Sequence, residues 1–179
     1  MTSGEAPIIL TSERLLFRPH IMADMDAYCS MDQDAEVRRY VGGKPRTREE
    51  AERRFLNGFQ PVTDRMAMWA TILKADNSYI GRCGLFPHFQ SNGEKIPGEG
   101  ALGLYIAREH WRKGYATEAG KAFVDFGFNE LNIKKIVTAI EAGNDASVHV
   151  IEKLGFTLSY TEYVHRTYYH YVLEKFKHV

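Results

Sequence analysis

The sequence is poor in several features, and each shortage excludes a class of protein. It has no excess of charge, because 23 lysines and arginines balance 23 aspartates and glutamates. Since binding to a phosphate backbone needs an excess of basic residues, a nucleic acid is not expected as the main partner. Only two cysteines are present, Cys29 and Cys83, too few for a disulfide framework in a chain of 179 residues. We expect both to be reduced, buried and structural.

Signals for membranes, export and metals are missing as well. No stretch approaches the roughly 20 apolar residues that span a bilayer, so no membrane partner is expected. Residues 1–7 have neither the basic start nor the apolar run of a signal peptide, which predicts a cytoplasmic protein. No set of histidine, cysteine, aspartate and glutamate residues has convincing ligand spacing, so we predict no metal.

The hydrophobic pattern is that of one mixed domain. Hydrophobic residues make up 44% of the chain, and its length fits a single domain over residues 1–179 with a core from about 11 to 176. Thr47, followed by Glu50, forms a capping box at a helix start, and Gly155 suits a helix end. The predicted strands are 14–18, 66–74, 79–86, 100–107, 134–140, 158–164 and 167–175. The predicted helices are 24–31, 47–59, 116–130 and 146–154, and 87–98 is predicted to be a loop with possible mobility. This order indicates a mixed α/β (α+β) fold with a mostly antiparallel sheet.

The segment Trp111-Arg-Lys-Gly-Tyr-Ala-Thr117 is the most informative part of the chain. It joins a strand to a helix, where several backbone N–H groups point outward at the positive end of the helix dipole, and such a nest binds phosphates. Gly114 permits a tight turn and close approach of a phosphate, and Ala116 keeps the helix near the ligand. An ordinary turn before a helix is the alternative. The loop is neither GxxxxGK(S/T) nor GxGxxG, which weakens ATP and dinucleotide hypotheses.

Several segments in this order resemble the GNAT N-acetyltransferase superfamily, and within it the RimJ/RimL branch. The resemblance covers about residues 11–176 and rests on the combined order and spacing of five pieces. These are Thr11-Ser-Glu-Arg-Leu-Leu-Phe-Arg-Pro19, Asp34-Ala-Glu-Val-Arg-Arg-Tyr40, Ile80-Gly-Arg-Cys-Gly-Leu85, Gly103-Leu-Tyr-Ile106 with Trp111-Arg-Lys-Gly-Tyr-Ala-Thr-Glu-Ala119, and Asn144-Asp-Ala-Ser147 with Glu152-Lys-Leu-Gly-Phe156. The resemblance implies a six- to seven-stranded sheet flanked by about four helices, and acetyl-CoA as co-substrate.

The resemblance also implies roles for single residues. Leu104, Tyr105 and Ile106 form the cofactor strand, with Leu104 and Ile106 bonding the pantetheine arm through their backbones. Asn144 contacts the pantetheine region, and Ser147 lies near the thioester sulfur. The residues implied to hold the pyrophosphate follow the strand: Trp111, Arg112, Lys113, Gly114, Tyr115, Ala116 and Thr117.

The chain departs from the superfamily pattern at two positions. Trp111 stands where glutamine or arginine is frequent, although tryptophan is common there in this branch. Ile151 stands where many members carry a tyrosine general acid, and an isoleucine cannot protonate a thiolate. Catalysis therefore uses another donor or needs none.

Glu99 and Ser147 are the candidate catalytic residues. A lysine-type amine is mostly protonated at pH 7, so a base must take a proton before the nitrogen attacks. Glu99 begins the cofactor strand, and alternation puts it on the face of Ala101, near which the branch's usual carboxylate aligns. A solvated strand-end carboxylate is the alternative. Ser147 is the candidate donor to the leaving sulfur, or an ordinary first-turn serine.

The acceptor side is assigned to Tyr40, Glu99 and His165. Tyr40 would line the entrance between the first two helices, or serve as a packed aromatic. His165 belongs to a cluster in the final hairpin with Tyr163, Tyr168 and Tyr169, which either shapes substrate access or consists of strand-forming aromatics. His149 is expected at the surface.

The sequence therefore predicts an N-acetyltransferase that moves an acetyl group from acetyl-CoA to a primary amine in a ternary complex. The acceptor stays open among a protein N-terminus, a ribosomal protein and a small amine, because a fold does not choose among them. A monomer or a homodimer is expected. A non-catalytic acyl-CoA-binding module is the alternative, and a nucleic-acid-binding domain is opposed by the net charge.

Overall fold

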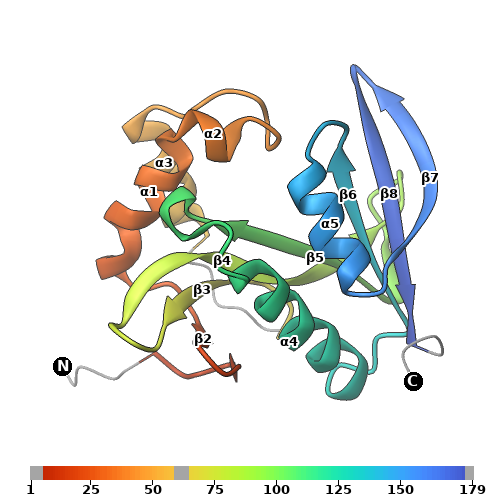
Figure 1. The fold of residues 1–179 in the computed structure, drawn as a ribbon, viewed down its shortest axis with the longest axis horizontal. Helices are drawn as coiled ribbons and strands as arrows, with labels where there is room; N and C mark the ends of the chain where they lie inside the picture. The colour runs from red at the N-terminus through yellow and green to blue at the C-terminus, as the bar shows by residue number, and fades with distance from the viewer. Residues whose placement is uncertain (1–5, 59–64, 176–179) are drawn as a thin grey trace.

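One mixed sheet forms the centre of the molecule in the residues that this computed structural model describes, 6–58 and 65–175 (Figure 1). Its strand order is β1-β2-β3-β4-β5-β6-β8-β7, and every neighbouring pair is antiparallel except β5 and β6. The strands are β1 (Leu10–Thr11), β2 (Leu15–Arg18), β3 (Met68–Leu73), β4 (Ser78–Phe89), β5 (Lys95–Ile106), β6 (Lys135–Glu141), β7 (Thr157–Val164) and β8 (Arg166–Glu174). The helices are α1 (Met25–Gln33), α2 (Ala35–Arg38), α3 (Arg48–Asn57), α4 (Tyr115–Asn129) and α5 (Asp145–Lys153), with short 3-10 turns at Met22–Asp24 and Arg108–His110.

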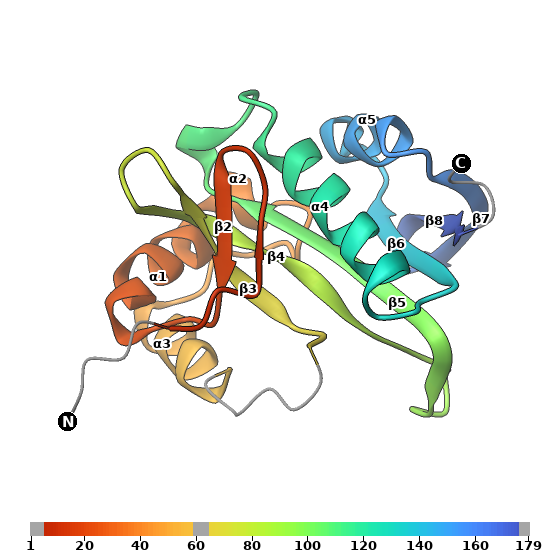
Figure 2. The same ribbon diagram turned by 90° about the horizontal axis from the view of Figure 1, so that it is seen from below.

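The two faces of the sheet carry different helices. Alternation along β4 shows this, because the guanidinium of Arg82 lies 4.3 Å from the ring centroid of Tyr28 in α1. Leu85 points to the opposite face, where a Cβ added at Gly127 of α4 would lie 2.7 Å from its Cδ1. Helix α4 lies along β5 with α5 beside it (Figure 2). The sheet thus separates an α1–α3 side from an α4–α5 side.

The main core fills the space between the sheet and α4. Ala119, Phe123 and Phe126 recur at helical spacing on α4 and are all buried. Gly120 lies on the same helix, where an added Cβ would collide with Leu154, the C-cap of α5, and would lie 3.3 Å from Leu104 of β5. A glycine there lets α4 approach β5 closely, so the start of the helix is held at the end of that strand.

Most of the predicted elements are confirmed, with small shifts at their ends. The mixed, mostly antiparallel fold is confirmed, as is the capping box of α3, in which Thr47 accepts from the Glu50 N–H and Glu50 accepts from the Thr47 N–H. Gly155 follows α5 with φ +89°, and Cys29 and Cys83 are free and fully buried. The predicted ends at residues 59 and 176 lie outside the described residues.

Three predictions about the elements are corrected. The sheet has one more strand than expected, because β1 spans only two residues and two residues cannot show an alternating pattern. The described residues contain a fifth helix, the single turn α2, which begins at Ala35 after its N-cap Asp34, and the Asp34 side chain accepts from the N–H groups of Glu36 and Val37. The 87–98 loop is mostly strand: β4 runs to Phe89 and β5 begins at Lys95, with Pro87 beside a bulge where a strand tolerates proline.

Candidate functional site

A fork between the parallel strands β5 and β6 organises the candidate site. The two strands pair only from Glu99, Gly100 and Ala101 to residues 135–137, and they then diverge (Figure 1). Just past the last pair, the Thr138 hydroxyl donates to the Leu102 carbonyl at 3.2 Å. The β6-facing edge of β5 is therefore open beyond Leu102.

Leu104 presents its backbone to this open edge. Neighbouring residues of a strand direct their backbone groups to opposite sides. The carbonyl of Leu102 faces β6, because it accepts from Thr138, and residues 104 and 106 follow in phase. The carbonyl of Ile106 already accepts from the Trp111 indole N–H at 2.7 Å. The Ala107 N–H bonds to the Ile80 carbonyl of β4 at 2.8 Å, so the backbone of Tyr105, which is in phase with it, faces the other way.

The loop between β5 and α4 exposes a run of backbone N–H groups. Gly114 is the N-cap of α4 with φ +81°, and Arg112 also has a positive φ of +60°. Within the part of the chain that the structure describes, no hydrogen bond uses a backbone N–H of residues 112–117. These donors lie at the positive end of a helix of 15 residues, as an anion site requires.

Arg14 and Glu118 hold this loop in place, and sequence reasoning missed both. Arg14 donates through Nη1 to the Lys113 carbonyl at 3.0 Å and through Nε to Glu118 at 2.6 Å. Its guanidinium also lies 4.5 Å from the ring centroid of Tyr115. Glu118 accepts further bonds from the Ser12 hydroxyl and the Arg14 N–H. Burial raises the pKa of Glu118, but these bonds outweigh burial and the pKa is lowered.

The start of α5 lies on the other branch of the fork. The Asn144 side chain caps the helix by accepting from the Ser147 N–H at 3.3 Å, so its amide N–H groups stay available for another partner. The Ser147 hydroxyl is half-buried. Ile151 is a core residue with 4% exposure and has no polar atom to offer.

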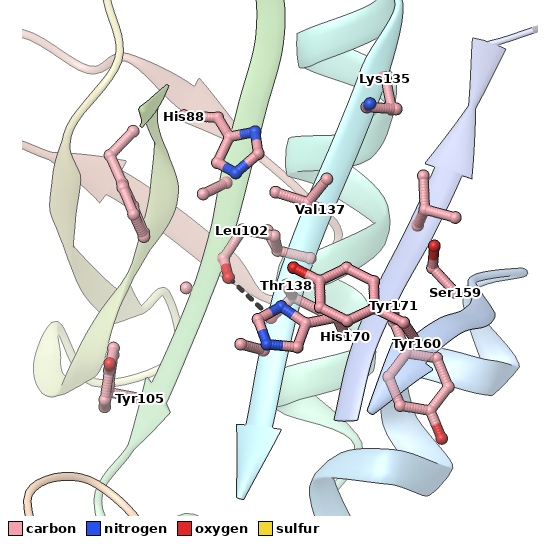
Figure 3. Close-up of a pocket in the computed structure, with 15 residues that line it drawn as sticks. His88, Leu102, Tyr105, Lys135, Val137, Thr138, Ser159, Tyr160, His170 and Tyr171 are labelled. Carbon is pink, nitrogen blue, oxygen red and sulfur yellow. Dashed lines mark hydrogen bonds between the residues drawn. The ribbon is translucent and has the colours of Figure 1, made fainter. Parts of the chain in front are cut away.

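A cavity of about 370 Å³ lies against the fork on the face opposite α4 (Figure 3). Its walls come from β4, β5, β6, β7 and β8, including Tyr105, whose side chain points into it. The polar side chains of its lining are those of His88, Tyr105, Lys135, Thr138, Ser159, Tyr160, His170 and Tyr171. None of the described residues that line it is acidic.

Glu99 lies beside this cavity and is held by two basic groups. Its Oε2 bonds to Nδ1 of His88 at 2.8 Å, and its Oε1 pairs with the Lys135 ammonium at 2.5 Å. The Glu99 side chain is only 16% exposed. Burial raises the pKa of Glu99, but the bonds from Lys135 and His88 outweigh burial and lower it. Glu99 is therefore ionised at neutral pH, with both oxygens engaged.

The remaining acceptor-side predictions fall in different places. Tyr40 reaches the turn before α5, since a Cβ added at Gly143 would lie 3.7 Å from its ring and hydroxyl. His165 lies at the exposed tip of the β7–β8 hairpin with φ +61°. The hairpin histidine that lines the cavity is His170, which stacks on Tyr160 at 4.2 Å and bonds to Glu162 at 3.1 Å. Alternation along β8 would have been the signal for it.

A sheet that forks between two parallel strands, beside a helix start rich in free amides, is the architecture of an acyltransferase of the GNAT class. The chain belongs to this family: the family model described as acetyltransferase (GNAT) domain matches residues 14–157. Acetyl transfer is the reaction of the family, and acetyl-CoA is its acetyl donor. No helix within the described ranges is long and apolar enough to cross a membrane, and none of their side chains form a three-residue metal-binding group.

Individual relatives agree with this assignment. The chain is 30% identical to the uncharacterized N-acetyltransferase p20 of Bacillus licheniformis over 149 residues, 82% of this chain and 81% of the relative. It is 33% identical to the uncharacterized protein YkkB of Bacillus subtilis over 72% of each chain. A GNAT-family acetyltransferase of Bacillus anthracis has the same fold, with a TM-score of 0.81, 22% identity, and coverage of 92% of this chain and 97% of the other.

Proposed function

We propose that this protein transfers an acetyl group from acetyl-CoA directly to a primary amine. The observation that carries the proposal is the run of free N–H groups at residues 112–117, next to a fork whose far side opens into a cavity. The N–H groups and the charges of Arg112 and Lys113 suit a pyrophosphate. The open edge at Leu104 suits an added strand-like chain, such as a pantetheine arm.

Each part of the site then has a chemical task. Bound acetyl-CoA supplies an activated thioester. The Leu104 and Ile106 N–H groups and the Asn144 amide orient the pantetheine arm and polarise the thioester carbonyl. Ser147 donates to the leaving sulfur. Glu99 takes part in removing a proton from the acceptor ammonium. Tyr40 and the β7–β8 hairpin with His165 shape the acceptor entrance.

The charge of the cavity narrows the acceptor. A spermidine N(1)-acetyltransferase of Escherichia coli is 36% identical over 55 residues, 31% of this chain, and a Vibrio cholerae spermidine N-acetyltransferase solved with CoA and spermine shares the fold with a TM-score of 0.75 and 19% identity. A polyamine carries several positive charges and needs unpaired carboxylates. Glu99 is already paired, and the basic Lys135 lines the cavity. We therefore expect a monoamine or a peptide α-amine to be a better acceptor than spermidine.

The pyrophosphate loop is tested by two variants of nearly equal shape. An added Cβ at Gly114 would meet only Arg14 Nη2, at 3.4 Å, and both asparagine and aspartate tolerate a positive φ. Gly114→Asn should weaken acetyl-CoA binding slightly, and Gly114→Asp should weaken it at least about tenfold more, because its charge would oppose the phosphates. Calorimetric titration measures both. Equal affinities of the two variants would contradict the loop assignment.

Thiol release completes the test. With spermidine, benzylamine and a peptide with a free α-amine as acceptors, we expect amine-dependent release of CoA thiol. Binding of acetyl-CoA without thiol release in the presence of any amine would favour the non-catalytic acyl-CoA-binding module. Ile151, at the position where many family members have a tyrosine, is the reason to consider that alternative. No binding would contradict both hypotheses.

A further inference from the structure

His88, Glu99 and Lys135 form a charge chain that ends at the cavity. Glu99 of β5 and Lys135 of β6 are partners in the parallel register, and His88 reaches Glu99 from the end of β4. His88 and Lys135 line one end of the cavity, whereas His170 and Tyr160 lie at the other (Figure 3). The His88 side chain is 33% exposed, so the ring is open to a molecule in the cavity.

The bond to Glu99 decides which histidine nitrogen is available. Nδ1 of His88 lies 2.8 Å from Oε2 of Glu99. An ionised carboxylate only accepts hydrogen bonds, so Nδ1 carries the hydrogen. The neutral ring then keeps its lone pair on Nε2, the atom that can accept a proton from the cavity. A carboxylate behind an imidazole fixes its tautomer and orientation and stabilises its protonated form.

Glu99 is poorly suited to take the proton itself. Both of its oxygens are engaged, by His88 and by the Lys135 ammonium, and these bonds lower its pKa. A base needs a lone pair free to receive the proton, which Nε2 of His88 has and the engaged oxygens of Glu99 do not. Ala101, on the same strand face as Glu99, is a small residue of the cavity lining and offers no group of its own.

We propose that Nε2 of His88 is the general base for the acceptor amine and that Glu99 is its positioning residue, with Lys135 neutralising Glu99. This rests on the proposed acetyl transfer. An ammonium acceptor loses one proton to Nε2, and its nitrogen then forms a bond to the thioester carbonyl carbon. As the C–S bond breaks, the second N–H proton passes to the departing thiolate. The products are the amide and the CoA thiol, and His88 returns its proton to solvent.

The test compares kcat against pH for the wild-type protein and two variants. It uses benzylamine at saturation with saturating acetyl-CoA. His88→Gln keeps a donor toward Glu99 but removes the base, so we expect kcat to fall about 100-fold and the acidic limb of the wild-type profile to disappear. Glu99→Gln keeps the base but removes its charge partner, so we expect a loss of about tenfold and a limb shifted to lower pH. The acceptor's own ionisation is common to all three profiles.

Within the described residues, the charged and titratable groups that share the cavity wall with His88 or bond to it are Glu99 and Tyr105 from β5, Lys135 from β6, Tyr160 from β7, and His170 and Tyr171 from β8. Glu99→Gln removes the charge that is bonded to His88. His149→Gln, at an exposed position of α5, is the control and should keep the wild-type profile. Acetyl-CoA affinity should be the same in all proteins. If the wild type is active and His88→Gln has the same kcat and the same acidic limb of the pH profile, this inference is overturned but the proposed function is not. The reverse pattern, a larger loss in Glu99→Gln than in His88→Gln, would do the same. No thiol release by the wild type would overturn the proposed function and this inference with it.

Discussion

Trp111 shows how a side chain can serve the loop without offering a polar group to a ligand. Its indole N–H bonds to the Ile106 carbonyl at 2.7 Å, which ties the end of β5 to the loop before α4. The residue is nevertheless 41% exposed. A glutamine or arginine at this position would contribute a polar group to a ligand. Tryptophan instead ties down the backbone, whose N–H groups we propose as the pyrophosphate donors.

Ser147 is the residue on which turnover should depend without the cofactor affinity changing. Its backbone N–H is used by the Asn144 cap, and Ile151, one turn later, has no proton to give. Ser147→Ala keeps the cap, because the cap uses only the backbone. We expect kcat to fall about tenfold, since one hydrogen bond to a developing charge is lost, while the Kd of acetyl-CoA stays within about twofold.

Two controls separate this role from a structural one. Ser147→Thr retains a hydroxyl and should recover much of the rate, and Asn144→Ala should destabilise α5 by about 1 kcal/mol through loss of the cap. Thiol-release kinetics and calorimetry measure both effects. An unchanged kcat in Ser147→Ala would remove the serine from the mechanism.

At the scale of the element, strong local patterns can be predicted from the sequence, but the pairing register of the strands cannot. The capping box of α3, the apolar face of α4 and the Gly114 loop each depend on residues close together in the sequence, so all three can be predicted from it. Helix α2 is too short to have a period, and Pro87 looks like the end of a strand although a bulge accommodates it.

The charge chain beside the cavity illustrates the same limit at the site. The sequence predicts a loop at His88, so it does not reveal that His88 lies on the same strand face as Arg82 of β4. Glu99 and Lys135 meet only because a helical crossover returns the chain to a parallel strand in one register. Nothing local in either segment specifies that register, so the sequence indicates Glu99 as a base candidate but does not indicate its partners.

Arg14, which contacts the loop before α4 and the first turn of that helix, should contribute to acetyl-CoA affinity. This side chain bonds the Lys113 carbonyl and neutralises Glu118, an acidic residue close to the anion site. Arg14→Ala should lower acetyl-CoA affinity about three- to tenfold, because the loop loses a tether and the carboxylate becomes uncompensated. Calorimetric titration at two salt concentrations should show a smaller difference at high salt.

A matched arginine controls for general effects on the helix. Arg65 pairs with Glu130 at 2.7 Å at the other end of α4, and its guanidinium lies 4.6 Å from the ring centroid of Phe126. Arg65→Ala removes a similar charge far from the loop and should leave the affinity unchanged. Equal losses in the two variants would mean that the Arg14 effect is not local.

At the scale of the whole molecule, the layer of α1 and α3 is held to the sheet by buried polar groups as well as by packing. Asp32 of α1 is fully buried and pairs with Arg82 of β4 at 2.6 Å and with Arg46 at 2.8 Å. Next to this cluster, the His20 ring contacts Tyr28 and Phe55 edge-on, at centroid distances of 5.7 and 5.9 Å. Tyr40, which we propose to line the acceptor entrance, lies in the turn after α2, in the connection between α1 and α3.

His20 should make the stability of the whole fold depend on pH. Burial lowers the pKa of His20 from 6.5 to about 4, with Asp24 opposing the shift and Arg82 and Arg18 adding to it. Between these two values the unfolded chain binds a proton that the folded chain does not. The part of the folding stability that depends on neutral His20 is therefore fully present above pH 6.5 and is lost as the pH falls toward 4. The loss attributable to His20 is about 2 kcal/mol between pH 7.5 and pH 5.

His20→Phe should remove that part of the dependence, because phenylalanine keeps the ring contacts and cannot bind a proton. Urea unfolding at pH 7.5 and pH 5 measures the free energy of unfolding of both proteins. We expect the wild type to lose about 2 kcal/mol more than the variant between the two values. His149→Gln, at an exposed site, should follow the wild type. Parallel losses in the wild type and His20→Phe would show that His20 is protonated equally easily in the folded and unfolded chains. The α1–α3 layer would then be open enough to water to solvate that charge.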